Sequence, residues 1–223
     1  AEATFDETQG IPSALRSGLN LGMSGVPYWG SDGTGFKCLT NFPRDKEVYL
    51  RWAELMAVSP IMMEQNACSN PVTPGQTKWS LWNDAETTTT YAAMARLHTR
   101  LQPYFEVLAQ ESHDTGAPLM RHPFLTNPES VDARNVDDEF FLGASLFAAP
   151  VVRRHERIKD VWLPPGRYVD LDDGAVYDAR GEGAGGDDGL HTAIEAPLDK
   201  LPLLLVEGHM VPMLDASVTT LAE

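Results

Sequence analysis

The spacing of apolar side chains changes at Gly116, and this change constrains the fold more than any other feature of the chain. Before it, strand-like runs lie at residues 21–30 and 60–63. Segments with helical apolar spacing follow at residues 46–59 and 88–112. Strand, loop, helix repeated in this order is a βα unit, which predicts a parallel sheet.

The chain beyond Gly116 has a different pattern. Short apolar runs are separated by Pro, Gly and Asp turns with little helical period between them, which predicts a β-rich domain. The sequence therefore predicts two domains, an α/β part at residues 1–116 and an all-β part at residues 117–223. The predicted strands lie within residues 118–125, 139–152, 160–171, 175–180 and 201–214.

The longest segment with helical spacing, residues 88–112, contains one residue that predicts a bend and is followed by one that predicts the end of the helix. Pro103 interrupts the helical pattern and predicts a bend, because proline removes a helical hydrogen bond. Gly116 is a plausible C-terminal stop, because glycine adopts the left-handed conformation that ends many helices.

Composition narrows the classes of partner. The chain has 32 acidic and 17 basic residues and a net charge of −15, so nucleic acid and anionic membranes are poor partners. The first residues show neither a basic nor an apolar targeting region, and the absence of an initiating Met suggests a processed product or a piece of a longer protein. A cytoplasmic, periplasmic or secreted location is compatible with the sequence. Neither cysteine has metal-ligand spacing, so no metal or cofactor is predicted.

Polar and aromatic side chains gather after the two strand-like runs. Trp29 and Asp32 follow the first, and Glu64 with its neighbours Gln65 and Asn66 follows the second. In a βα barrel the C-terminal ends of strands form one rim, so these side chains would face one pocket. The loop aromatics Trp79 and Trp82 suit the face of a sugar. Each residue also has an ordinary alternative: Asp32 as a helix cap, Glu64 in an ion pair, and the tryptophans in the core.

Other motifs are weaker. Ser24 in GMSG lacks the second glycine of a nucleophile elbow, which favours a packing role. His98 is interpreted as holding a loop by a hydrogen bond, with general-base catalysis the less favoured role. Acidic, Gly-rich stretches at residues 170–174 and 181–189 are interpreted as turns or a mobile loop, and a Ca²⁺ loop is the alternative.

Taken together, several motifs resemble glycoside hydrolase family 31, the family of α-glucosidases, α-xylosidases and sulfoquinovosidases. SGVPYWGSDGTGF is similar to the family's seventh barrel strand, and RWAELMAVSPIMMEQN is similar to the segment through the eighth. FLGASLFAAPVV, VWLPPGRYVDL and APLDKLPLLLVEGHMVPML look like its proximal C-terminal β-sandwich. The resemblance implies the last strands and helices of a (β/α)8 TIM barrel followed by an antiparallel β-sandwich.

The resemblance also implies an activity. It implies a retaining α-glycosidase that hydrolyses terminal α-linked sugars, with Asp32 binding sugar hydroxyls. An oligosaccharide or glycoside is the expected substrate. The alternative is a non-catalytic carbohydrate-binding or scaffold module.

The catalytic residues implied by the resemblance lie outside the chain. The family's nucleophile lies on the fourth strand, and its acid/base Asp lies roughly thirty residues before the position of Asp32, which is at or just before Ala1. We therefore name no catalytic residue within the chain and expect both the nucleophile and the acid/base upstream of Ala1. The upstream half of the same enzyme is accordingly the expected partner.

Two further expectations concern the sugar loops. Where the family commonly has an arginine and a histidine, this chain has Met63 and Gln65, so the identity of the sugar is open. Cys38 and Cys68 follow two consecutive strands whose loops would rise on the same barrel face. A disulfide between them is a hypothesis, and two small buried side chains are the alternative.

Overall fold

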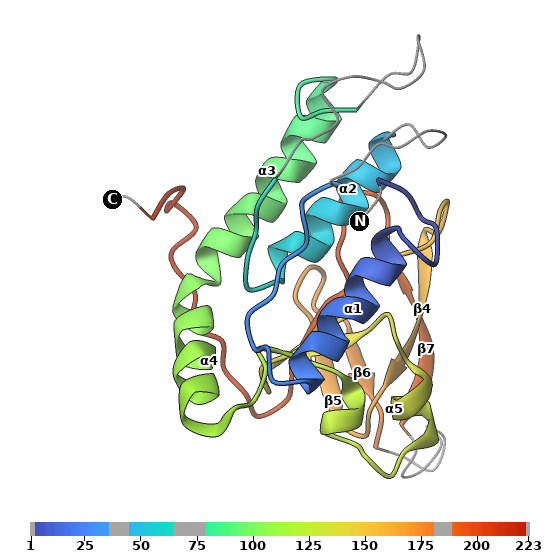
Figure 1. The fold of residues 1–223 in the computed structure, drawn as a ribbon, viewed down its shortest axis with the longest axis vertical. Helices are drawn as coiled ribbons and strands as arrows, with labels where there is room; N and C mark the ends of the chain where they lie inside the picture. The colour runs from blue at the N-terminus through green and yellow to red at the C-terminus, as the bar shows by residue number, and fades with distance from the viewer. Residues whose placement is uncertain (1–2, 36–44, 65–78, 181–188, 222–223) are drawn as a thin grey trace.

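The computed structural model describes residues 3–35, 45–64, 79–180 and 189–221. Four longer helices come first, and strands dominate the rest of the chain (Figure 1). The helices are α1 (Ile11–Met23), α2 (Lys46–Ala57), α3 (Ala85–Arg100), α4 (Gln102–Thr115) and the short α5 (Val131–Asn135). Within the described ranges, no helix is long and apolar enough to cross a bilayer.

Local signals explain where the helices begin and end. The carboxylate of Asp45 accepts a hydrogen bond from the backbone N of Val48 at 3.0 Å and caps α2. Asp84 caps α3 in the same way through Thr87 N at 2.7 Å. The predicted bend is confirmed, because the long helix divides at Leu101 just before Pro103. The predicted stop is confirmed too: Gly116 caps α4 with φ of 79°.

Two sheets follow the helices. The larger has six strands in the order β1-β2-β3-β8-β5-β6, and β4 pairs with β7 in a second sheet; all pairs are antiparallel. In Figure 1, β4 and β7 lie at the right of the molecule and α3 and α4 at the left. The strands are β1 (Met120–Arg121), β2 (Phe140–Leu142), β3 (Leu146–Ala148), β4 (Ile158–Leu163), β5 (Arg167–Asp170), β6 (Val176–Asp178), β7 (Leu190–Glu195) and β8 (Leu203–Val206).

The expected strand at residues 21–30 is wrong. Residues 21–23 are the last turn of α1, and Ser24 caps it. Residues 26–30 run extended without a strand partner, and Tyr28 is 45% exposed. Residues 60–63 likewise form no strand. A parallel strand needs backbone neighbours, and the described residues provide one isolated bridge, between Gly33 and Glu64.

Three elements were not predicted: the helix α1, the short helix α5 and the strand β7. The helix α1 does have a helical pattern, with Ile11, Leu15, Leu19 and Gly22 all buried on one side. The strand β7 has only one well-buried apolar position, Ile194, so its sequence carries little apolar signal. Its long pairing with β4 identifies it as a strand only in three dimensions.

The apolar core joins the helices to the larger sheet. One cluster of buried side chains includes Leu15 of α1, Trp52 of α2, Phe105 of α4 and Phe140 of β2. A second cluster lies within the β-rich part, between Phe147, Val161 and Tyr168. The boundary between residues 116 and 117 is a prediction, and the larger cluster extends across it. The helical part and the sandwich therefore stabilise each other.

The hydroxyl of Tyr104 fastens α4 to the turn between β2 and β3. It donates to Leu142 O at 2.8 Å and accepts from Ser145 N at 3.1 Å in a buried position. Replacing Tyr104 with Phe leaves both backbone groups without this partner, and we expect a loss of about 1–3 kcal/mol in the free energy of unfolding. Equilibrium urea unfolding measures it. Tyr177→Phe is the matched control, since no hydrogen bond from that hydroxyl is seen among the described residues, and equal losses in the two variants would contradict the assignment.

Candidate functional site

Two extended segments lie side by side at the place where the sequence predicts the sugar site. The backbone N of Gly33 donates to Met63 O at 2.9 Å, and Gly33 pairs with Glu64 in a parallel bridge. A Cβ at Gly33 would lie 2.3 Å from Met63 O, so only glycine allows this approach. Asp32 and Met63 are thereby brought together. Both segments rise toward the end of the molecule where α2 and α3 begin (Figure 1).

Asp32 is partly buried, and its carboxylate has no hydrogen-bond partner within the part of the chain that the structure describes. Its backbone oxygen accepts from Gly35 N at 3.1 Å, which turns the chain after the extended segment. The next described helix, α2, is capped by Asp45, so capping of that helix does not occupy Asp32. The carboxylate is therefore available to a ligand.

The tryptophans differ in their surroundings. Trp29 packs against the larger apolar cluster, and a Cβ at Gly18 of α1 would lie 2.5 Å from its ring. Trp79 is half-buried: its indole N donates to Thr87 Oγ1 at 2.9 Å, and the ammonium of Lys46 lies 5.9 Å from its ring centroid. Trp82 is 80% exposed. Packing therefore accounts for much of Trp29, while Trp79 is held at the surface.

The second segment presents Met63 and Glu64. Met63 is 40% exposed, and the carboxylate of Glu64 accepts from the hydroxyl of Tyr49 at 3.0 Å. Tyr49 is a neutral donor, so this contact is a hydrogen bond and not an ion pair.

Several predicted positions lie outside the described residues. They are Gln65 and Asn66 of the sugar loop and the two cysteines, Cys38 and Cys68. Ala1 lies outside them as well, and the catalytic pair is expected upstream of it. The structure therefore tests neither the disulfide nor the position of the catalytic pair, and both stay predictions.

Two side chains of α2 contact this region. Besides the contact of Tyr49 with Glu64, the indole N of Trp52 donates to Ser31 Oγ at 2.7 Å, next to Asp32. Both side chains are fully buried. The sequence shows them only as apolar positions of a helix. A buried Tyr or Trp usually has a hydrogen-bond partner for its hydroxyl or indole N–H. Tyr49 and Trp52 at apolar helix positions therefore indicated polar partners nearby, which the sequence analysis missed.

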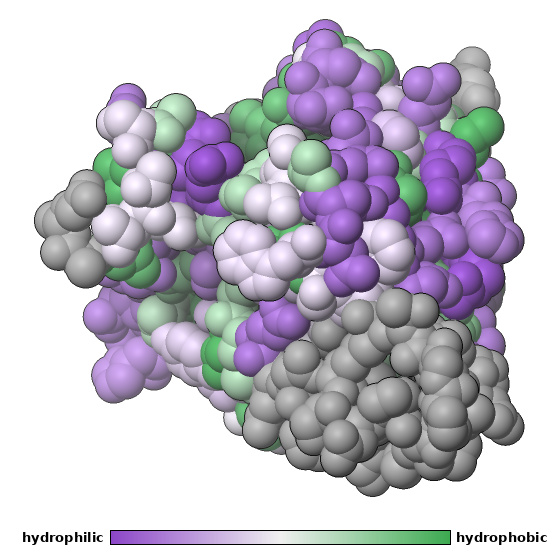
Figure 2. Space-filling model, turned by 90° about the horizontal axis from the view of Figure 1, so that it is seen from above, coloured by the Kyte–Doolittle hydropathy of each residue, from purple (hydrophilic) through white to green (hydrophobic). Residues whose placement is uncertain are grey.

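The surface at this end of the molecule is mixed. Figure 2 shows it from above, with hydrophilic side chains interspersed with weakly apolar ones. Lys46 is one of the charged groups at the start of α2 and pairs with Asp84 at 2.9 Å and with Glu86. These carboxylates are thus engaged, in contrast with Asp32.

The weaker motifs have structural roles. Ser24 caps α1, and its hydroxyl donates to Asn20 O at 2.8 Å. The ring of His98 lies 3.3 Å from Ala57 O and packs on Phe105, and burial lowers its pKa. The predicted hydrogen bond of His98 is present, but it reaches the last residue of α2 and not a loop.

The acidic turn at residues 170–174 already holds a cation. The ammonium of Lys200 lies 3.1 Å from Asp170 and 2.9 Å from Asp173. It occupies the position that the alternative interpretation gave to Ca²⁺. Within the described ranges, no group of three or more His, Cys, Asp or Glu side chains could hold a metal ion. Most of the stretch at residues 181–189 lies outside those ranges.

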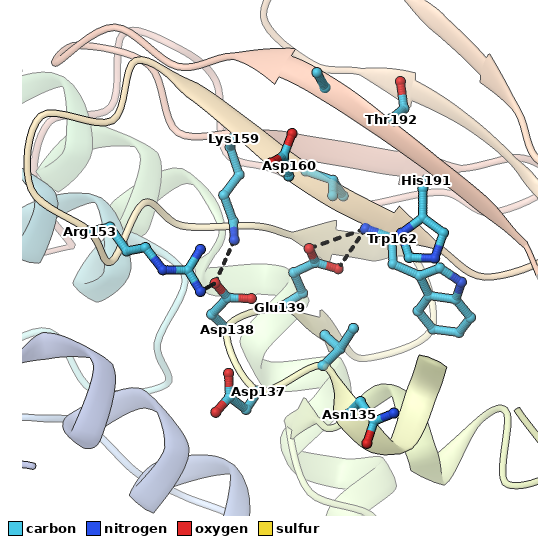
Figure 3. Close-up of a pocket in the computed structure, with 13 residues that line it drawn as sticks. Asn135, Asp137, Asp138, Glu139, Arg153, Lys159, Asp160, Trp162, His191 and Thr192 are labelled. Atoms are coloured by element: carbon cyan, nitrogen blue, oxygen red, sulfur yellow. Dashed lines mark hydrogen bonds and ion pairs between the residues drawn. The ribbon is translucent and has the colours of Figure 1, made fainter. Parts of the chain in front are cut away.

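A separate polar pocket of about 590 Å³ lies in the β-rich part (Figure 3). Lys159 of β4 points into it and pairs with Asp138 at 2.6 Å, and Arg153 lies 3.9 Å from the same carboxylate. Both oxygens of buried Glu139 accept from the backbone N of Trp162 at 3.2 Å. None of the predicted sugar-binding residues lines this pocket. Its buried Lys159 and Glu139 have partners of their own, which indicates a stabilising network.

Comparison with known proteins identifies the family. Residues 5–107 match the TIM-barrel domain of glycosyl hydrolases family 31, and residues 116–211 match the glycosyl hydrolase family 31 C-terminal domain. The chain belongs to glycosyl hydrolase family 31. The family resemblance seen in the sequence, and the fold class of a barrel end followed by a sandwich, are both confirmed.

Individual relatives match nearly the whole chain but are much longer. An isomaltosyltransferase of Sporosarcina globispora is 31% identical over 95% of this chain and 18% of its own length. Alpha-glucosidase 2 of Bacillus thermoamyloliquefaciens is 29% identical over 91% of this chain and 23% of its own length. The structure of the cycloalternan-forming enzyme from Listeria monocytogenes aligns with a TM-score of 0.80 at 30% identity, over 95% of this chain and 19% of that one. The chain spans about a fifth of the length of these relatives.

Burial gives Glu139 an unusual titration. Loss of hydration raises its pKa from 4.5 to about 8, although Lys159 opposes the shift. Between these values the folded state keeps a proton that the unfolded state releases, so this group's contribution to stability is present below about pH 4.5 and is lost as the pH rises through about 8.

Glu139→Gln removes the titrating group and keeps an acceptor for Trp162 N. We therefore expect its Tm to rise relative to the unmodified chain as the pH increases from about 5 to about 9. Thermal unfolding across this range measures the difference. Glu129→Gln, on an exposed glutamate, is the control. A Tm difference for Glu139→Gln that does not change with pH would contradict the raised pKa.

Proposed function

We propose that the chain is the C-terminal part of a retaining α-glycosidase that hydrolyses terminal α-linked sugars, with Asp32 as the acceptor of sugar hydroxyl hydrogen bonds. The observation that carries the proposal is the Asp32 carboxylate, unpaired among the described residues, where the two extended segments meet in a chain that matches both family 31 domains. An ionised carboxylate can accept hydrogen bonds from two hydroxyls at once, and such charge-assisted bonds are strong.

The role of Asp32 is to orient the sugar. Fixing the ring places the anomeric carbon for attack by groups elsewhere, which is a large source of rate enhancement. Trp79 and Glu64 are proposed to contact the same sugar, together with Gln65 and Asn66. Met63 offers neither the charged fork of Arg nor a ring donor, so glucose is one candidate beside galactose, an N-acetylhexosamine or another glycoside.

The catalytic pair is proposed to come from the upstream half of the same enzyme, before Ala1. Retaining glycosidases use two carboxyl groups about 5–5.5 Å apart. Among the described residues near the site, Asp84 and Glu86 are tied to Lys46, and Glu64 is hydrogen-bonded to Tyr49. Within that part of the chain, Asp32 is thus left without a second free carboxylate beside it, which supports a binding role and an oligosaccharide or glycoside as the substrate.

A second candidate reaction is glycosyl transfer. It is favoured by one observation: the relatives that match this chain include one named isomaltosyltransferase and one described as forming cycloalternan. Hydrolysis and transfer share the same first half and differ in whether water or a sugar hydroxyl takes up the glycosyl group. The products of the reaction distinguish them.

The test uses Asp32→Asn in the longer enzyme that contains this chain. Loss of two charge-assisted hydrogen bonds, each about 1.5–3 kcal/mol, should lower kcat/KM at least about a hundredfold and leave Tm nearly unchanged. Steady-state kinetics on α-linked aryl glycosides and thermal unfolding measure the two effects. Asp160→Asn, an exposed aspartate on β4, is the matched control and should keep full activity.

Several outcomes would change the assignment. A fully active Asp32→Asn enzyme, or one that does not fold, would remove Asp32 from the sugar site. Product analysis with α-linked oligosaccharides should show released monosaccharide, whereas longer products would show transfer. Saturable sugar binding without any turnover would favour the non-catalytic module instead.

A further inference from the structure

One side of α2 is fastened to the β-rich part of the chain through Arg51. This arginine is fully buried, and its guanidinium donates to Ala196 O at 2.6 Å, to Pro197 O at 3.0 Å and to Glu156 O at 3.0 Å. These carbonyls flank the paired strands β4 and β7, and Ala196 N donates to Arg157 O at 2.8 Å between them. A single side chain thus binds three backbone groups at the end of the sandwich.

Two glutamates of α2 complete the attachment. Both oxygens of buried Glu54 lie 3.0 Å from the same guanidinium nitrogen of Arg51. Burial raises the pKa of Glu54, and Arg51 opposes this shift. Glu47, one turn before, accepts from His155 N at 2.9 Å and from Arg157. We call Glu47, Arg51 and Glu54, with the backbone groups they bind, the α2 clamp.

The clamp has little freedom to move. Separating a buried guanidinium from its partners leaves an uncompensated charge, which costs free energy. The guanidinium of Arg51 is therefore expected to keep its hydrogen bonds to these acceptors. His155 adopts a left-handed backbone conformation with φ of 64°, and its amide is bound by Glu47. An unfavourable conformation of this kind persists where surrounding contacts enforce it. The position of α2 is therefore set by the sandwich.

Other side chains of α2 contact the candidate sugar site. Trp52 follows Arg51 directly and holds Ser31, the neighbour of Asp32, and Tyr49 holds Glu64. Every residue of the helix from Glu47 onward is buried, so the helix has no room to shift without disturbing both sides. A path of direct contacts thus runs from the sandwich through α2 to both extended segments.

We infer that Arg51 is a positioning residue, through which the sandwich sets the geometry of the two sugar-facing segments. This inference rests on the proposed function for its effect on turnover. A displacement of about 1 Å in a substrate-positioning group can lower a rate about a hundredfold. The sandwich therefore contributes to sugar recognition without touching the sugar.

The test compares Arg51→Lys with Arg167→Lys in the longer enzyme. Lysine keeps the charge but cannot bind three carbonyls and a carboxylate with a planar fork. Arg167 is the matched control, because it pairs with Glu207 at 2.9 Å on the sandwich surface, away from α2. Native-state hydrogen exchange reports on the amide of Gly33, which donates to Met63 O. Steady-state kinetics, measured well below Tm so that the enzyme stays folded, give kcat/KM and thereby report on the geometry of the sugar site.

We expect Arg51→Lys to speed exchange at Gly33 and to lower kcat/KM at least about tenfold, while Arg167→Lys changes neither. The effects of Arg51→Lys and Tyr49→Phe on kcat/KM should be non-additive, because both act on the position of Glu64. Unchanged exchange at Gly33, or full kcat/KM in folded Arg51→Lys, would overturn the inference. If that variant does not fold, Glu47→Gln decides by the same two measurements.

The two readouts separate the hypotheses. Exchange at Gly33 tests the clamp whether or not the enzyme turns over a glycoside. An unmodified enzyme that is inactive on every α-glycoside, with faster Gly33 exchange in Arg51→Lys, would contradict the proposed function and leave the mechanical link standing.

Discussion

The buried guanidinium of Arg51 on α2 restricts how the helices and the sandwich can pack together. Arg51 and Glu54 are both fully buried, and a charge in that position is tolerated only when it is paired and hydrogen-bonded. The other partners of Arg51 are backbone carbonyls of the sandwich, so the helix and the sandwich must meet in one arrangement. The shared apolar core then fills the space between them.

This arrangement gives the two parts of the chain different tasks. The helical part carries the extended segments and the carboxylate of Asp32, whereas the sandwich holds the helix behind them. The polar pocket around Lys159 is lined by residues of the sandwich and has its own internal pairs. Membership of family 31 fits this division, because the matched barrel and C-terminal domains meet along the same core.

The site illustrates why the grouping of residues was easier to anticipate than their contacts. Asp32 and Glu64 follow apolar runs in the sequence, and the bridge between Gly33 and Glu64 brings those positions together. The interpretation of the runs as buried strands was wrong, since apolar character indicates burial against some partner without specifying a sheet. Trp29 shows the same ambiguity, because its ring packs on Gly18.

Features that depend on neighbours within a few residues could be predicted from the sequence. They are the helix α2, the bend at Pro103, the stop at Gly116 and the succession of short strands after it. Apolar period, proline and glycine act locally, so they can be read from the chain. Contacts between distant residues required the folded chain: Arg51 binds Ala196, 145 residues away, and Lys200 pairs with the carboxylates of the acidic turn. A buried charge selects its partner from whatever the fold brings within hydrogen-bond distance, and no local pattern encodes that choice.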